Sequence, residues 1–319
     1  MKSLNIYHDF NLGLKFYTIP KFFLESLNEK YVGIKFIDIH SNNINKEDVE
    51  LFFGNRIRNC DLKFFTNLKW IHLGCVGYDS LDLEYLKKHK ILLTNSSGLM
   101  TNSMVEQAIN FITSFSRSSH RINQLRNNGE LSREKFDSFF HEVTNLNGKK
   151  ILICGYGEVG KKLVKILDAL QMEIFVISRN KKTNFKTFKV EELPFAVQGM
   201  DFVINLFPMS NDLKHVFNKK VFSKMNNSFF INIGRGQTVN ESELINAIEN
   251  KNLLGAALDV FEKEPLDKNN ELFKYDNIIL TPHIAGLDSS YWIKQFELFT
   301  HNLESYILNN LELMKNRIK

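Results

Sequence analysis

Cysteine is scarce in this sequence. There are 3 cysteines among 319 residues; Cys60, Cys75 and Cys154 stand far apart, without CxxC or metal-ligand spacing. A sparse, odd number excludes a disulfide framework and fits a reducing compartment. We therefore expect neither a disulfide scaffold nor a metal site.

Long apolar runs are also lacking. No stretch approaches the roughly 18–20 residues that span a bilayer. The segment 1–20 is polar, carries Asp9 and lacks the apolar core of a signal peptide. The sequence therefore predicts a cytoplasmic protein with no membrane partner.

Charge of one sign does not dominate. Lysine and arginine number 41 against 36 aspartate and glutamate, a net charge of +5. The basic residues are scattered rather than gathered into a nucleic-acid-binding arm, so no nucleic acid partner is expected. Hydrophobic residues make up 43% of the chain, which is ordinary for a globular protein, and the length predicts about two domains.

Short apolar runs alternate with helical patterns, which is typical of α/β folds with parallel sheets. The predicted strands of the first part are Tyr31–Ile39, Asp48–Phe53, Leu68–Leu73 and Ile91–Thr94, and the predicted helices are Pro20–Glu29 and Leu81–His89. A long helix linking two domains is predicted from Ser103 to about Gly129, with Ser103 as its N-cap and Glu106 completing a capping box.

The alternation restarts near residue 150 and is more regular there. The predicted strands are Lys150–Cys154, Glu173–Ile177, Phe202–Leu206, Ser228–Ile233, Gly255–Asp259 and Ile278–Leu280. The predicted helices are Gly160–Leu170, Asn240–Asn250 and a terminal helix Tyr291–Met314.

A glycine-rich turn joins the first strand and helix of this second part. Gly155, Gly157 and Gly160 form G-x-G-x-x-G, with Tyr156, Glu158 and Val159 between them. The glycines permit a tight turn, close approach of a pyrophosphate and close helix packing, and the helix N-terminus offers free N–H groups to phosphates. This context predicts dinucleotide binding, with a plain tight turn as the alternative.

The same residues also begin a P-loop pattern. Gly155 to Lys161 spells G-x-x-x-x-G-K, but Lys162 stands where a P-loop needs Ser or Thr to ligate magnesium. The nucleotide-triphosphatase hypothesis is therefore much the weaker.

The residues after the next predicted strand indicate which dinucleotide binds. NAD-binding proteins place Asp or Glu here to bond the ribose hydroxyls. This chain instead has Ser178 and Arg179, followed by Asn180, Lys181 and Lys182. A hydroxyl, a guanidinium and ammonium groups attract a 2′-phosphate, so NADP(H) is favoured over NAD(H). A solvated basic loop is the alternative.

Three ordered blocks carry a more specific signal. Ile231–Gly236, Ala257–Pro265 and Thr281–Gly286 resemble the signature blocks of the D-isomer-specific 2-hydroxyacid dehydrogenases. Further segments that match are Gly74–Asp82, Asn95–Gly98 and Asp201–Pro208. Within that family, Ile204–Pro208 and the Ser178–Arg179 pair resemble the NADPH-dependent glyoxylate/hydroxypyruvate reductases.

The resemblance implies a catalytic role for three residues. Arg235 would bind the substrate carboxylate and the carbonyl oxygen, His283 would be the general acid/base, and Glu264 would be its charged partner. Reduction of a 2-oxo acid places negative charge on oxygen, which a cation and a proton donor stabilise. Histidine titrates near neutrality, and a nearby carboxylate raises its pKa. A surface arginine, a solvated glutamate and a structural histidine are the alternatives.

The resemblance assigns further site residues. The backbone N–H groups of Val76 and Gly77 would hold the substrate carboxylate, with a plain turn as the alternative. Asp259 would bond the nicotinamide carboxamide, Pro208 and Ser210 would border the adenine side, and Ser103 would lie near the phosphates. Ile233, Gly234, His283 and Gly286 are also assigned to the cofactor.

The chain departs from the family pattern in places that put the substrate side chain in doubt. Gln107 stands where the family usually has His, and the third block continues as Ala285–Gly286–Leu287–Asp288. No tryptophan lies between Gly129 and Leu146, where some hydroxypyruvate reductases place one.

The combined prediction is an α/β enzyme with two Rossmann-like, doubly wound parallel-sheet domains. A dinucleotide-binding domain, 100–286, is inserted into a flavodoxin-like substrate domain made of 1–99 and 287–319. The resemblance implies a homodimer that reduces a small 2-oxo acid, such as glyoxylate or hydroxypyruvate, to the D-2-hydroxy acid. A non-catalytic NAD(P)-sensing scaffold is the alternative.

Overall fold

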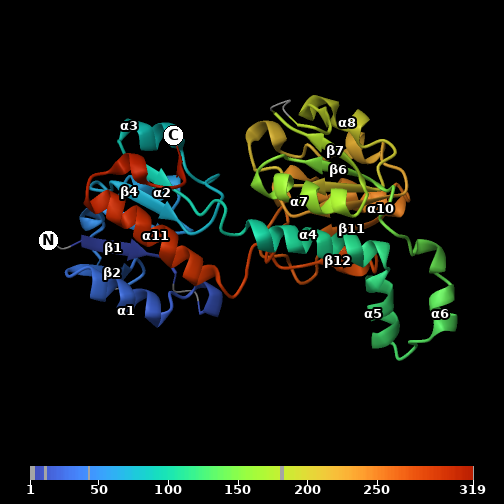
Figure 1. Cartoon of the computed structure of the whole chain (residues 1–319), viewed down its shortest axis with the longest axis horizontal. Helices are drawn as coiled ribbons and strands as arrows, with labels where there is room; N and C mark the ends of the chain where they lie inside the picture. The colour runs from blue at the N-terminus through green and yellow to red at the C-terminus, as the bar shows by residue number, and fades with distance from the viewer. Residues whose placement is uncertain (1–3, 11–12, 42–43, 180–182, 319) are drawn as a thin grey trace. The chain divides into compact units, whose positions relative to one another are not determined.

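The computed structural model describes residues 4–10, 13–41, 44–179 and 183–318. The chain folds into two compact units (Figure 1), unit 1 comprising Met1–Met100 and Leu287–Lys319 and unit 2 comprising Thr101–Gly286. The first boundary differs by one residue from the predicted one, because Met100 packs against the core of unit 1.

Unit 1 is built on one sheet of six strands. The strands are β1 (Leu4–His8), β2 (Ile34–Asp38), β3 (Leu51–Gly54), β4 (Trp70–Leu73), β5 (Leu92–Thr94) and β13 (Arg317–Ile318). Their order is β13-β5-β4-β3-β1-β2. β1 to β5 are parallel and β13 is antiparallel to β5. The parallel part has the flavodoxin-like order 2-1-3-4-5.

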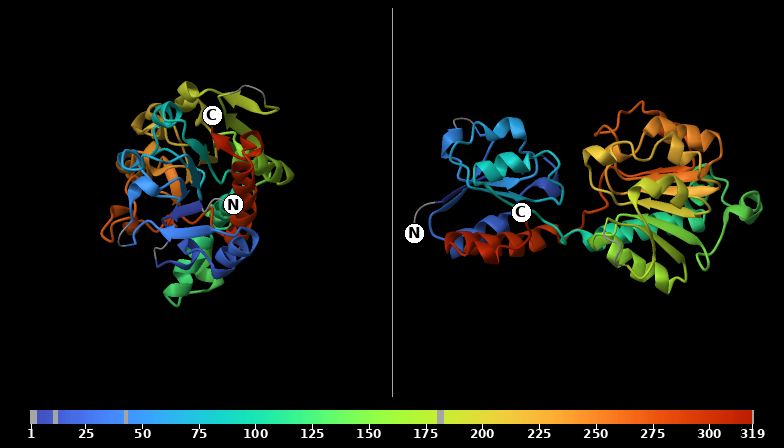
Figure 2. Two further views of the ribbon diagram at one scale, coloured as in Figure 1. Left: turned by 90° about the vertical axis from the view of Figure 1, so that its left-hand side faces the viewer. Right: turned by 90° about the horizontal axis from the view of Figure 1, so that it is seen from above.

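Helices cover both faces of the sheet of unit 1. They are α1 (Lys21–Lys30), α2 (Asn59–Leu62), α3 (Leu83–Lys88) and α11 (Tyr291–Ile307), with 3-10 turns η1 (Lys15–Tyr17), η2 (Lys46–Asp48) and η8 (Leu311–Leu313). Phe23 of α1 and Phe299 of α11 pack on one face, and Leu62 of α2 and Leu86 of α3 pack on the other. The right-hand view of Figure 2 shows α11 lying along one face.

Unit 2 contains a longer, wholly parallel sheet. Its strands are β6 (Lys150–Cys154), β7 (Glu173–Ile177), β8 (Lys186–Phe188), β9 (Phe202–Asn205), β10 (Ser228–Asn232), β11 (Leu253–Leu258) and β12 (Ile278–Leu280). The order β12-β11-β10-β9-β6-β7-β8 is the Rossmann order 3-2-1-4-5-6 with one strand added. The two sheets confirm the predicted doubly wound α/β class.

The helices of unit 2 also lie on two faces. They are α4 (Thr101–Ser116), α5 (Ser119–Asn127), α6 (Arg133–Asp137), α7 (Glu158–Ala169), α8 (Leu193–Ala196), α9 (Lys219–Phe222) and α10 (Glu241–Glu249), with 3-10 turns η3 (Phe140–Glu142), η4 (Val190–Glu192), η5 (Asn211–Leu213), η6 (Gly236–Thr238) and η7 (Glu271–Lys274). Buried side chains of α4 and α7 fill one core, and those of α8, α9 and α10 fill the other.

The predicted linking helix differs from the observed structure at its start and in its middle. The helix predicted from Ser103 begins at Thr101, so Ser103 lies in the first turn of α4 and is not its N-cap. The same helix breaks at Ser118, whose φ of 50° is left-handed. Serine rarely adopts this conformation, so nothing in the pattern marked the break.

Three further elements differ from the prediction. The terminal helix ends at Ile307 rather than Met314, because Asn309 turns left-handed with a φ of 57°, as asparagine often does after a helix. β1 was missed because its polar-flanked sequence contains no long apolar run, although Ile6 and Tyr7 are buried. β8 has only 3 residues and was missed as well.

Candidate functional site

The predicted glycine-rich turn connects β6 to α7 in unit 2. Gly155 has a φ of 118°, which favours glycine, and a Cβ at Gly160 would collide with the carbonyl oxygen of Gly155. Gly157 is the N-cap of α7, and nothing lies within 4 Å of the place where its Cβ would stand. This open helix N-terminus fits the pyrophosphate of a dinucleotide.

The remaining residues of this turn precede or begin α7. Tyr156 precedes α7, and Glu158 and Val159 are in its first turn. Lys162, which breaks the P-loop pattern, hydrogen-bonds through its ammonium group to the side-chain oxygen of Asn102 at the start of α4. Ser103 is half-buried in that same first turn of α4.

The predicted selectivity segment follows β7. Ser178 is half-buried, Arg179 is exposed, and Asn180–Lys182 lie outside the described residues, including the predicted cofactor residue Lys181. The pKa of Asp212 is lowered by the neighbouring Ser210 side chain and by its own backbone, and the charge of Arg179 contributes as well. The loops after β7 and β9 are therefore neighbours.

Buried amides hold the loop that carries Arg235. The Asn205 side chain, at the end of β9, donates to the Asn232 oxygen at 2.9 Å and to the Thr238 hydroxyl at 2.7 Å. Asn232 Oδ1 accepts the N–H of Gly234 at 3.1 Å, and the Thr238 hydroxyl donates to the carbonyl of Arg235 at 2.6 Å. Since Asn205 and Thr238 are fully buried, this network fixes the backbone of the loop.

Two of the predicted catalytic residues form a close pair. Nδ1 of His283 lies 2.7 Å from Oε2 of Glu264, a charge-assisted hydrogen bond when the imidazole is protonated. This hydrogen bond raises the pKa of His283 above its ordinary value, against burial, which lowers it. Burial raises the pKa of Glu264, but the hydrogen bond and charge of His283 outweigh it and the net pKa is lowered.

The third predicted residue, Arg235, acts on this pair through its charge. Its Nη1 donates to the carbonyl of Gly234 at 2.9 Å, and its charge contributes to a lower pKa of both Glu264 and His283. The structure thus brings all three predicted side chains to one edge of the sheet of unit 2. A cation, a carboxylate and a titratable ring in this arrangement can stabilise an anion and transfer a proton.

Asp259 holds the loop that carries His283. Its buried carboxylate accepts the Thr281 hydroxyl at 2.5 Å and the N–H groups of Ile284 and Ala285 at 2.9 Å each. The N–H of His283 donates to the Asp259 carbonyl at 2.8 Å, and His283 has a left-handed φ of 55°. Such backbone conformations cluster at functional sites, where surrounding contacts impose them.

The other predicted cofactor residues lie on the same unit. Ile233 is buried after β10, Pro208 is exposed and Ser210 half-buried after β9, and Gly286 is the last residue of unit 2. These positions all follow the carboxyl ends of parallel strands, where ligands bind in open α/β sheets.

The two residues predicted to hold the substrate carboxylate belong to unit 1. Val76 and Gly77 follow β4, and Asn95 donates through its side chain to the carbonyl of Val76 at 2.7 Å. Among the described residues, no acceptor is found for the N–H of either Val76 or Gly77. Both groups are therefore available to a ligand.

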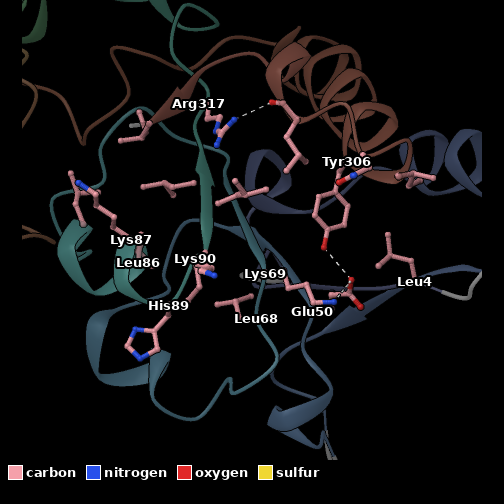
Figure 3. A pocket seen from close by; sticks show the side chains of 18 of the residues that line it. Leu4, Glu50, Leu68, Lys69, Leu86, Lys87, His89, Lys90, Tyr306 and Arg317 are labelled. Carbon is pink, nitrogen blue, oxygen red and sulfur yellow. Dashed lines mark hydrogen bonds and ion pairs between the residues drawn. The ribbon is translucent and has the colours of Figure 1, made fainter.

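Unit 1 also contains a large cavity of about 1200 Å³ at the other end of its strands. Leu4 and Leu92, the first residues of β1 and β5, line it. In Figure 3, the Tyr306 hydroxyl points to Glu50, to which it donates at 3.0 Å, beside Lys69. Because the candidate residues Val76 and Gly77 follow the carboxyl end of β4, this cavity does not contain them.

Among the described residues, no helix is long and apolar enough to cross a membrane. The same part of the chain contains no cluster of three or more His, Cys, Asp or Glu side chains placed to hold a metal ion.

The residues that hold these loops were not predicted. Asn205, Asn232, Thr238 and Thr281 had no assigned role, although Asn205 and Asn232 end β9 and β10 and Thr281 directly follows β12. Asn205 and Asn232 could have been identified in the sequence by one signal, namely a polar residue at the end of an otherwise apolar predicted strand.

Comparison with known proteins agrees with this geometry. Residues 109–285 match the family model described as "D-isomer specific 2-hydroxyacid dehydrogenase, NAD binding domain". A probable 2-ketogluconate reductase from Dictyostelium discoideum is 33% identical over 297 residues, covering 89% of this chain and 88% of the relative. A glyoxylate/hydroxypyruvate reductase from Arabidopsis thaliana is 29% identical, covering 93% of this chain and 89% of the relative.

Solved structures share the fold. A protein from Pyrococcus horikoshii is 30% identical with a TM-score of 0.78, covering 96% of this chain and 92% of that one. An NADPH-dependent glyoxylate/hydroxypyruvate reductase from Sinorhizobium meliloti, in complex with NADP and malonate, is 23% identical with a TM-score of 0.80, covering 95% of this chain and 93% of that one. The chain therefore belongs to the D-isomer specific 2-hydroxyacid dehydrogenases, a family of NAD(P)-dependent oxidoreductases.

Proposed function

We propose that this chain reduces a small 2-oxo acid, such as glyoxylate or hydroxypyruvate, to the D-2-hydroxy acid, with His283 as proton donor. The observation that carries the proposal is the 2.7 Å hydrogen bond between His283 and Glu264. Arg235 lies at the same edge of the sheet of unit 2, where its charge affects the pKa of both residues. The bound reduced nicotinamide cofactor supplies the hydride.

His283 delivers the proton that the reaction needs. Its pKa is raised by the hydrogen bond to Glu264, so the imidazole holds its proton to higher pH than a free imidazole does and can donate it to the carbonyl oxygen as negative charge develops there. In the reverse direction the neutral imidazole accepts the proton of the hydroxy acid. Glu264 stabilises the charged imidazolium and fixes the tautomer, since it occupies Nδ1 and leaves Nε2 for the substrate.

Arg235 binds the substrate carboxylate and polarises the carbonyl oxygen. Its planar guanidinium makes two parallel hydrogen bonds with a carboxylate, which fixes the orientation of the oxo acid. We assign the unpaired N–H groups of Val76 and Gly77 to the same carboxylate. Residues 1–99 with 287–319 then form the substrate domain, and 100–286 the cofactor domain.

The cofactor assignments follow the edge of the sheet of unit 2. The turn Gly155–Gly160 and Ser103 face the phosphates, and Pro208 and Ser210 border the adenine. Ile233, Gly234, Asp259, His283 and Gly286 lie on the nicotinamide side, where Asp259 binds the carboxamide. Its Oδ2 accepts one hydrogen bond in the structure, which leaves it capacity for another.

We propose NADPH as the preferred cofactor, with NADH as the alternative. Arg179 supports this preference. It is exposed after β7, where an NAD-binding protein places an acidic residue. A guanidinium there attracts a 2′-phosphate, whereas a carboxylate would repel it. Ser178 and Lys181 complete the proposed phosphate site.

We also propose a cytoplasmic homodimer built through unit 2. In this unit, α5 and α6 extend away from the sheet (Figure 1), and the nearby side chains of Leu131 and Phe140 are 61% and 67% exposed. Apolar side chains of this exposure fit a protein interface. Light scattering coupled to gel filtration should give twice the mass of the chain, and a monomer at micromolar concentration would refute this.

A panel of 2-oxo acids tested against both reduced cofactors decides the function. Glyoxylate, hydroxypyruvate, pyruvate and 2-ketogluconate are each incubated with NADPH or NADH, and loss of nicotinamide absorbance is followed; chiral analysis of the chiral products tests the D configuration. 2-Ketogluconate is included because one relative is named for it. We expect the largest kcat/KM for NADPH with glyoxylate or hydroxypyruvate. NADPH binding with no turnover of any acid would favour a cofactor-sensing scaffold instead.

A further inference from the structure

The turn Gly74–Gly77 in unit 1, called the carboxylate loop below, is held from beneath by the last long helix of the chain. The carbonyl of Gly74 accepts the Tyr291 hydroxyl at 2.8 Å and the Gln295 side-chain amide at 2.8 Å. Both donors lie on α11 and are separated from Gly74 by 217 and 221 residues. Tyr291 is 5% exposed and Gln295 is completely buried.

The other carbonyls of the carboxylate loop are also turned towards the protein. That of Cys75 accepts the N–H of Ser96 at 3.0 Å, and that of Val76 accepts the Asn95 side chain at 2.7 Å. The Cys75 thiol donates to the carbonyl of Gly77 at 3.3 Å. Because successive carbonyls are occupied on the inside, the N–H groups of Val76 and Gly77 are left for a ligand.

Gln295 has a fixed orientation. Its amide nitrogen also donates to the Ser96 hydroxyl at 2.6 Å, and that hydroxyl donates to the carbonyl of Leu73 at 2.7 Å. Burial lowers the pKa of His72 to about 3, and the Gln295 side chain opposes this shift only in part. The neutral His72 ring is hydrogen-bonded through Nδ1 to the Thr94 hydroxyl at 2.7 Å.

The packing around Gly74 leaves no room for a side chain at this position. A Cβ at Gly74 would stand 2.8 Å from the Tyr291 hydroxyl and 2.7 Å from Phe10. The Tyr291 hydroxyl keeps its proton, because burial raises its pKa. Tyr291 and Gln295 therefore act as neutral donors at a single carbonyl in a closely packed interior.

We propose that Gln295 and Tyr291 are positioning residues for the substrate carboxylate: by holding the Gly74 carbonyl, they keep the N–H groups of Val76 and Gly77 directed at the ligand. This rests on the proposed function, in which those N–H groups bind the carboxylate. Neither side chain touches the substrate; both act through the backbone of the loop.

The test uses the full-length enzyme with Gln295→Met, Tyr291→Phe and the double variant. Each single substitution removes a donor to the Gly74 carbonyl at nearly constant volume and should raise the KM for the oxo acid about three- to tenfold. The double variant leaves that carbonyl without either donor, and its KM should rise about a hundredfold. The kcat at saturating oxo acid and the dissociation constant for NADPH should stay within about twofold of the wild type.

Oxalate provides a readout without turnover. It is a carboxylate that the enzyme cannot reduce, and its dissociation constant, measured by calorimetry in the presence of NADPH, should rise by the same factors as KM. Ser305→Ala is the matched control on α11, since the Ser305 hydroxyl donates to the carbonyl of His301 and to no other group of the described residues. It should leave both constants unchanged, and thermal unfolding of every variant reports helix stability.

Wild-type oxalate affinity in the double variant would overturn the proposal, even if the variant unfolds at a lower temperature. The proposal would also be overturned if kcat fell in proportion to the fraction of folded protein while KM stayed unchanged. That result would show that the two residues only stabilise the fold. If the wild type reduces no 2-oxo acid, the proposed function fails by itself. Oxalate affinity in the variants then still decides the role of Gln295 and Tyr291.

Discussion

The two units hold their loops at the carboxyl ends of parallel strands in different ways. In unit 2, Asn205 and Asn232 end β9 and β10 and fix the Arg235 loop through hydrogen bonds within one stretch of about 35 residues. In unit 1, the carboxylate loop after β4 is held by Tyr291 and Gln295, more than 200 residues further along the chain. Unit 2 is therefore built locally, whereas unit 1 depends on its last helix.

This difference explains why the sequence predicts some site residues and not others. The glycine-rich turn and the three signature blocks are short and contiguous, so the family resemblance that the blocks carry indicates His283, Glu264 and Arg235 as candidates. Gln295 lies in an ordinary helical pattern, and its contact with Gly74 depends on how α11 packs on the sheet. Periodicity predicts which helix face is buried, but not which loop a buried amide meets.

The same reasoning covers the fold. Long periodic segments such as α7 and β6 were predicted closely, because local pattern and tertiary burial agree there. The break at Ser118 and the early end of α11 both depend on single left-handed residues, Ser118 and Asn309. Such conformations are imposed by the surrounding packing, and local propensity does not reveal them.

His283→Ala should have the largest effect, because the comparison assigns proton transfer to unit 2 and carboxylate binding to the loop of unit 1. Loss of the proton donor should lower kcat about 10²- to 10⁴-fold, while the dissociation constant for NADPH changes little. His215→Ala is the matched control, since His215 also pairs with a glutamate of unit 2, Glu262, at 3.4 Å. Comparable losses in the two variants would remove the special role of His283.

Arg235→Ala should have the next largest effect. Two charge-assisted hydrogen bonds to the carboxylate are lost, so kcat/KM should fall about a hundredfold, chiefly through a higher KM for the oxo acid. Arg235→Lys keeps the positive charge but not the planar guanidinium, so its kcat/KM should lie between those of the wild type and Arg235→Ala. The comparison predicts that Arg235→Ala also lowers kcat, whereas Gln295→Met does not, and an unchanged kcat in Arg235→Ala would contradict it.

The smallest effect concerns the cofactor. Arg179→Ala should raise the KM for NADPH about tenfold and leave that for NADH unchanged, because only NADPH carries the 2′-phosphate. Lys165→Ala removes another exposed cation of unit 2, on α7, and should change neither constant. Equal effects of Arg179→Ala on both cofactors would refute the selectivity assigned to Arg179.

The central claim is that Glu264 keeps His283 protonated for reduction, and the pH dependence of kcat/KM tests it most directly. Reduction needs the imidazolium, so the wild-type rate should fall as pH rises through the raised pKa of His283. Glu264→Gln removes the carboxylate that raises this pKa, so the fall should begin at lower pH. Glu262→Gln, at the His215 pair, should leave the profile unmoved. A profile identical in Glu264→Gln and the wild type would contradict the account.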